Sequence, residues 1–244
     1  MIFNHPLLTG LAASGLLLLA SQSHAQCQEP PLPPGTLGYT ACKDWPAQAG
    51  VQIRALATAP DNVTGEAQAG LFDLLVTQVD AGSQQVKASY TQTQAISSDA
   101  VAFDGLSVDT ARYQVGEGVR AFGIRSHFSH ESMYNPFASE NLSLFVVQGQ
   151  ALRPLLSDLN VYQYGGESEG RCQGQFSTRK RTLAMATTRS HGFADLIVKT
   201  SVVKRQATQR GDQCLEKNSP PQVSQVTLRY DGQRYVVPQG LRDE

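Results

Sequence analysis

Polar and apolar residues alternate with a period of two along much of this chain. The segments at 51–57 and 119–127 alternate in this way, and no segment keeps the 3.6-residue period of an amphipathic helix. The segment at 71–79 is apolar on both faces, which indicates a strand that is covered on both sides. These patterns predict an all-β fold, either a sandwich or a flattened barrel.

A weak internal repeat runs through this pattern at a shift of 122 residues. Nine of seventeen compared positions are identical between Gly70–Val76 and Gly192–Val198 and between Leu106–Val115 and Leu228–Val237. One short unit cannot cover both faces of its central strand, so we expect a single domain that contains both units. The predicted domain covers residues 26–244, with repeat units at about 51–115 and 179–238 and a connecting segment at 116–178.

Residues 1–25 have the features of a secretory signal peptide. An apolar run covers residues 11–20, and the small residues Ser23 and Ala25 occupy the positions that a signal peptidase recognises. The apolar run is too short for a membrane-spanning helix. We therefore predict cleavage after Ala25 and an exported protein, periplasmic or extracellular, with no transmembrane segment after the signal is removed.

All four cysteines lie after the predicted cleavage site, at Cys27, Cys42, Cys172 and Cys214. An even number of cysteines in an exported chain indicates disulfide bonds, and four cysteines allow three pairings. We expect Cys27–Cys42 and Cys172–Cys214, which join neighbours in the sequence. No Cys-x-x-Cys pair is present, so these residues predict no metal site.

The net charge is close to zero but unevenly distributed. Residues 26–170 carry 7 basic and 15 acidic residues, a net charge of −8, whereas residues 171–244 carry 13 and 6, a net charge of +7. Two interpretations remain open: the two parts attract each other and pack together, or the second part presents a basic face to an anionic partner. The candidate residues of that anion-binding face are Arg179, Lys180, Lys199, Lys204, Arg205 and Arg210.

The partner that fits such a face is an envelope protein or an anionic glycan. The basic residues are not interleaved with aromatic residues, as they are in many nucleic-acid-binding surfaces, and export takes the chain away from nucleic acid. We therefore expect no nucleic-acid partner. The sequence also predicts no cofactor.

Two patterns resemble catalytic or metal sites, and neither has the context that such a site requires. Gly166-Glu-Ser168-Glu-Gly170 has the spacing of a nucleophile elbow, but the residues that follow do not favour the helix that the elbow needs. His127 and His130 are three residues apart, which places them on opposite faces of a strand. The sequence therefore predicts no catalytic residue and no metal ligand.

Two aspartates interrupt apolar strands. Asp73 and Asp195 hold matching places in the two repeat units, and an unpaired carboxylate there would be costly. The matching basic residues Arg54 and Arg181 are the expected partners, in one structural ion pair per unit.

Two Asp-Gly pairs, at 104–105 and 231–232, predict hairpin turns between flanking strands. The segment at 128–141 is rich in polar residues and is expected to be a loop. The residues on either side of it, 119–127 and 142–147, are expected to be strands.

The preferred interpretation is an exported, disulfide-bonded binding protein without enzymatic activity, whose partner the sequence does not specify. One alternative is a hydrolase whose active site follows no known motif, which would need a cleft with converging carboxylates or histidines. A second alternative is a structural component of the envelope, which would self-associate.

Overall fold

The computed structural model of the protein describes residues 27–60, 70–170 and 172–242. Within these residues the chain forms twelve β-strands, one short 3-10 helix and no α-helix, which confirms the all-β prediction. The predicted signal peptide at 1–25 lies outside the described residues.

The elements follow the chain in simple order. They are β1 (Thr36–Asp44), β2 (Val51–Pro60), β3 (Gly70–Asp80), β4 (Val86–Ser98), β5 (Ala102–Gly116), β6 (Val119–His130), β7 (Phe137–Gln148), β8 (Ala151–Ser168), β9 (Gly174–Ser190), β10 (Phe193–Arg210), β11 (Gln213–Asn218), β12 (Gln222–Leu228) and η1 (Gln239–Leu241).

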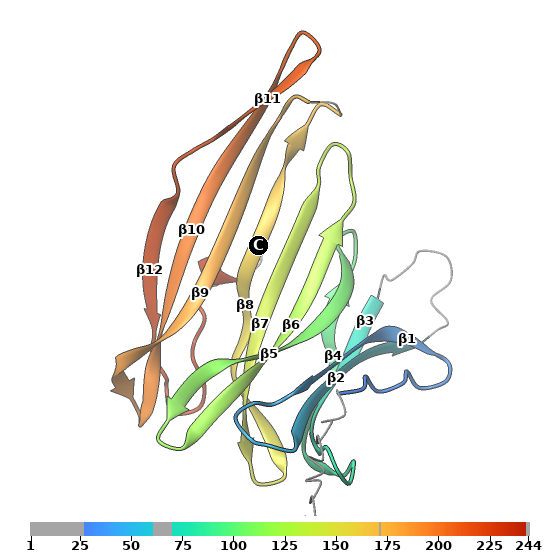
Figure 1. The fold of residues 1–244 in the computed structure, drawn as a ribbon, viewed down its shortest axis with the longest axis vertical. Coiled ribbons are helices and arrows are strands. Elements are labelled where there is room, and N and C mark those ends of the chain that lie inside the picture. The colour runs from blue at the N-terminus through green and yellow to red at the C-terminus, as the bar shows by residue number, and fades with distance from the viewer. Residues whose placement is uncertain (1–26, 61–69, 171, 243–244) are drawn as a thin grey trace, which may run out of the picture.

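The strands form one sheet that folds over on itself without closing. The order is β1-β2-β3-β4-β8-β7-β6-β5, and the sheet continues from β8 through β9 to β10, which pairs with both β11 and β12. The ladders are antiparallel except at Ser89 and Ala151, where a single parallel bridge joins β4 to β8. Figure 1 shows β1–β4 at the lower right, against the lower part of β5–β8, while β11 lies at the upper end of the molecule.

The folded sheet encloses an apolar core between β1–β4 and β5–β8. Ile53, Val76 and Phe145 are buried in it, and Trp45, the only tryptophan, packs edge-on against Phe122 with ring centroids 5.6 Å apart. The aromatic edge-to-face contact adds to the burial of the two rings. This core joins the two layers and gives the fold its sandwich character.

A second core covers the opposite face of β6–β8. Leu144 belongs to this core, whereas its neighbour Phe145 belongs to the first, as alternation along a strand requires. Tyr235, from the segment after β12, closes this second core, and its hydroxyl donates to the carbonyl oxygen of Ala194 at 2.5 Å. The strands β6–β8 are therefore buried on both faces over part of their length.

Both disulfide bonds form as predicted. The Cα atoms of Cys27 and Cys42 are 5.6 Å apart, and those of Cys172 and Cys214 are 5.5 Å apart. The first bond attaches the leading segment to β1, and the second attaches the turn between β8 and β9 to β11. No helix in the described parts of the chain has the length and apolarity to cross a membrane. The two disulfide bonds fit an exported protein.

The structure does not confirm the internal repeat. Residues 70–76 and 193–198 both lie in strands, β3 and β10, but the second pair of segments differs. Residues 106–115 lie inside β5, whereas residues 228–237 contain the end of β12 and a turn at Gly232, whose φ is +103°. Asp109 and its counterpart Asp231 therefore differ in structure: Asp109 lies within a strand, whereas Asp231 lies in the predicted Asp-Gly turn.

Two local predictions were wrong. No hairpin forms at residues 104–105, because β5 continues through them with a bulge that keeps Phe103 fully buried. The loop predicted at 128–141 is shorter than expected, since β6 extends to His130 and β7 begins at Phe137. In both places the pairing of β5, β6 and β7 overrides the local polar residues.

Candidate functional site

The six predicted anion-binding residues do not share one face. They lie on β9 and β10, where successive side chains point to opposite faces of the sheet. Register pairs show which residues belong together: Arg179 is opposite Val202 and Ser177 is opposite Lys204. The structure therefore divides the six into Arg179, Lys204 and Arg210 on one face and Lys180, Lys199 and Arg205 on the other.

A fourth cation joins the first of these faces. Lys217 on β11 is opposite Gln206, so it shares a face with Lys204. Arg179, Lys204 and Lys217 are diagonal neighbours on three adjacent strands, at a typical spacing of about 7–8 Å. Together with Arg210 they form what we call the basic strip.

The cations of the basic strip are available to a ligand. Lys204, Lys217 and Arg210 are exposed, and the described residues give them no ion pair. Arg179 is half-buried and donates to the side chain of Gln163, which is neutral. Two carboxylates near the strip, Glu167 and Glu169, are outnumbered by its four cations, so the local charge is positive.

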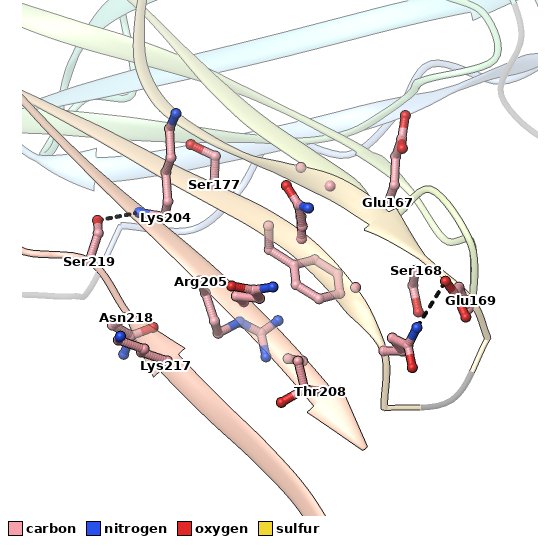
Figure 2. Close-up of a pocket in the computed structure, with 18 of the residues that line it drawn as sticks. Glu167, Ser168, Glu169, Ser177, Lys204, Arg205, Thr208, Lys217, Asn218 and Ser219 are labelled. Atoms are coloured by element: carbon pink, nitrogen blue, oxygen red, sulfur yellow. Dashed lines mark hydrogen bonds between the residues drawn. The ribbon is translucent and has the colours of Figure 1, made fainter. Parts of the chain in front are cut away.

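A shallow groove of about 1210 Å³ lies where the ends of β8–β11 come together. Its lining includes Lys204 and Lys217 with uncharged hydrogen-bonding side chains, among them Gln175, Ser177 and Gln206, and it extends to Phe176 and Arg205 of the opposite face. Figure 2 shows Glu167, Ser177 and Lys204 extending in the same direction from β8, β9 and β10. This surface offers cations and amides or hydroxyls side by side.

On the opposite face of the same strands, Arg205 is already engaged. Its guanidinium lies 4.2 Å from the centroid of Phe176, forms an ion pair with Glu216, and donates to the hydroxyl of Tyr164 at 3.2 Å. The three contacts fix the position of the guanidinium, and the carboxylate of Glu216 neutralises part of its charge. Arg205 is therefore a poorer anion ligand than Lys204.

Close packing against two aromatic rings, those of Phe176 and Tyr134, accounts for the two glycines of the Gly-x-Ser-x-Gly pattern. A Cβ atom at Gly166 would lie 2.6 Å from the ring of Phe176, so only glycine fits there. Gly170 has a φ of +82° and lies close to the ring of Tyr134. The hydroxyl oxygen of Ser168 accepts a hydrogen bond from the N–H of Gly170 at 3.2 Å. Packing and backbone conformation thus explain why glycine occupies both positions.

A serine, a histidine and a carboxylate meet elsewhere, on β5, β6 and β7. Ser107 Oγ lies 2.8 Å from His127 Nε2, and His127 Nδ1 lies 3.3 Å from Glu140 Oε2. We call these three residues the triad. No sequence pattern indicates Ser107 or Glu140, because only the pairing of β6 with β5, which contains three bulges, and with β7 brings them to His127.

The triad is part of a larger network of charges. Arg125 forms ion pairs with Glu140 and with Asp109, and the hydroxyl of Tyr113 donates to Asp109 at 2.7 Å. Burial alone would raise the pKa of the Asp109 carboxyl, but hydrogen bonds from Ala111, Arg125 and Tyr113 lower it overall. Burial and the bond to Asp109 raise the pKa of Tyr113.

The Glu140 carboxylate is held in its ionised form. The hydrogen bond from His127 lowers its pKa most, and the contacts with Arg125 lower it further against the effect of burial. An ionised carboxylate only accepts hydrogen bonds, so His127 carries its proton on Nδ1. In the neutral ring with this tautomer, Nε2 is the acceptor that faces the hydroxyl of Ser107.

The expected pairs of Arg54 with Asp73 and of Arg181 with Asp195 do not form. In the register of β2 and β3, Arg54 is opposite Thr77 and Asp73 is opposite Thr58, four residues further along. Arg54 contacts neutral side chains instead, and Asp73 is exposed.

In the second expected pair, the buried Arg181 donates to Asn160 at 2.6 Å and to the carbonyl of Gly240 at 3.1 Å. Hydrogen bonds from Ser190 and Thr188 lower the pKa of Asp195. Neither aspartate therefore belongs to an acid–base pair.

His127 and His130 point to opposite faces of β6, and His130 is exposed near its end. Within the described ranges no group of three or more His, Cys, Asp or Glu side chains is placed to hold a metal ion. Comparison with family models, with curated proteins and with solved structures found no match.

Proposed function

We propose that the protein is exported, to the periplasm or the extracellular space, and binds an anionic polysaccharide along the basic strip and the adjoining groove. The observation that carries this proposal is the diagonal row of Arg179, Lys204 and Lys217 on three adjacent strands. A rigid sheet fixes their spacing, so each cation can contact a different charge of an extended polymer.

The chemistry of the surroundings favours a polysaccharide over a small anion. A single phosphate or carboxylate requires donors that converge on one point, whereas these cations are spread along a row. Gln175, Ser177 and Gln206 lie between and beside them and can hydrogen-bond with sugar hydroxyls. The groove is open and shallow, as a site for a chain passing across the surface requires.

The proposal is tested by the binding of heparin, with neutral dextran as the comparison polymer, measured by titration calorimetry at low and high ionic strength. We expect heparin alone to bind, with an affinity that falls as salt rises, because exposed charges are screened over about 8 Å at physiological ionic strength. Absence of heparin binding at low ionic strength would refute the proposal.

Two double variants locate the site. Lys204→Glu with Lys217→Glu reverses two charges of the basic strip, and Lys180→Glu with Lys199→Glu makes the same change in net charge on the opposite face. We expect the first to weaken heparin binding at least about tenfold, roughly 1.4 kcal/mol, and the second far less. Equal weakening would mean that heparin responds to overall charge and not to this site.

A further inference from the structure

The triad has the connectivity of an activated serine. Ser107 Oγ is within hydrogen-bond distance of His127 Nε2, and the other nitrogen of the same ring faces the Glu140 carboxylate. The carboxylate fixes the ring so that Nε2 can take a proton from the serine hydroxyl. Three neighbouring strands of one sheet supply the three residues, so their positions are set by the ladders.

The triad is accessible from solvent. The side chain of His127 is 33% exposed, and that of Glu140 is 22% exposed. Gly105 is opposite His127 in the register, and a Cβ there would lie 3.7 Å from the imidazole Cδ2. The missing side chain leaves that edge of the ring open to an approaching molecule.

A cation stands next to the serine. Arg125 is opposite Ser107 in the register of β5 and β6, which places their Cβ atoms about 5 Å apart. Three guanidinium N–H groups donate to Asp109 and Glu140 in the contacts of the described residues. A guanidinium carries five such donors, so two remain for an oxygen that becomes negative beside Ser107.

We propose that Ser107 is a nucleophile toward small carboxylic esters, with His127 as its base, Glu140 orienting His127, and Arg125 stabilising the oxyanion. The expected ester has a small acyl group, because the triad lies on an open sheet face and none of its three residues lines the groove. This inference does not rest on the proposed function, because the basic strip lies on β9–β11.

The reaction consumes one ester and one water. Ser107 Oγ bonds to the ester carbonyl carbon while its proton passes to His127 Nε2. The bond from that carbon to the alcohol oxygen breaks, and the alcohol leaves with the proton from His127. Water then attacks the acyl-serine, giving one proton to His127, and Ser107 regains that proton as the carboxylic acid leaves.

The test uses the purified mature protein with a fluorophosphonate probe and, separately, with 4-nitrophenyl acetate. We expect one covalent adduct, located at Ser107 by peptide mass spectrometry. Ser107→Ala should abolish the adduct and lower ester hydrolysis at least about tenfold, whereas Ser201→Ala, on the same sheet face at β10, should change neither.

His127→Gln separates an activated serine from a structural cluster. Glutamine retains hydrogen-bonding capacity in place of the imidazole but cannot act as the base, so labelling of Ser107 should fall at least about tenfold while the thermal midpoint stays near that of the native protein. If Ser107 is not labelled in the folded native protein, or is labelled equally in His127→Gln, the proposal is wrong and the cluster only stabilises the sheet.

Discussion

The ring of Phe176 lies directly against Gly166, so that a Cβ at position 166 would come within 2.6 Å of ring atom Cδ1 and 2.3 Å of the carbonyl oxygen of Gln175. Gly166→Ala must therefore move the ring or the backbone of β9. We expect a loss of about 1–3 kcal/mol in the free energy of unfolding, measured by urea denaturation.

Gly240→Ala is the matched control for this prediction. A Cβ at Gly240 would meet nothing within 4 Å, so we expect a change below about 0.5 kcal/mol. Equal stability of the two variants would show that Phe176 does not need the space that Gly166 leaves.

The charge network around Arg125 predicts a pH dependence of stability. The pKa values of Asp109 and Glu140 in the folded protein lie below their ordinary values of 3.8 and 4.5. Their contribution to the free energy of unfolding is therefore fully present above about pH 5 and is lost as the pH falls through the lowered values. Urea denaturation between pH 7 and pH 3 measures this loss.

Arg125→Met removes the cation that Asp109 and Glu140 share. We expect a loss of about 2–3 kcal/mol in the free energy of unfolding at pH 7, because two partly buried carboxylates then lack their partner. The loss should shrink at pH 3, where protonation removes their charges. Arg112→Met, at an exposed position of β5, should change stability by less than about 0.5 kcal/mol at either pH. A loss independent of pH would contradict this account.

The disulfide Cys172–Cys214 stabilises the part of the sheet that carries the basic strip. All six residues of β11 are exposed, and β11 pairs only with β10 among the described strands. Replacing both cysteines by serine should lower the free energy of unfolding by about 2–4 kcal/mol. Hydrogen exchange should show the largest loss of protection in β10 and β11; equal loss in β2 and β3 would contradict the local role.

The sequence predicted the fold class, the disulfides and several strands because each depends on local or compositional signals. Alternation marks strands such as β2 and β6, and export with four cysteines indicates disulfides. The hairpin at 104–105 could not be excluded from sequence, because Asp-Gly favours a turn only when the flanking strands pair with each other. Here Phe103 is held in the core by β6, so β5 runs through.

The candidate sites depend on register, which single-sequence patterns do not fix. The six cations were expected to share one face, but Lys204 and Arg205 are adjacent in the sequence and therefore point to opposite faces. Lys217 was missed because its place beside Lys204 follows from the pairing of β10 with β11. Ser107 and Glu140 were missed for the same reason, since their places beside His127 follow from the pairing of β6 with β5, which contains three bulges, and with β7.

The measurement that tests the binding proposal most directly is lysine acetylation of the mature protein with and without heparin at low ionic strength, followed by mass spectrometry. Lys204, Lys217, Lys180 and Lys199 are all exposed, and they divide two and two between the faces of the same strands. The account predicts that heparin protects Lys204 and Lys217 and leaves Lys180 and Lys199 reactive. Equal protection of all four lysines, or protection of Lys180 and Lys199 alone, would contradict it.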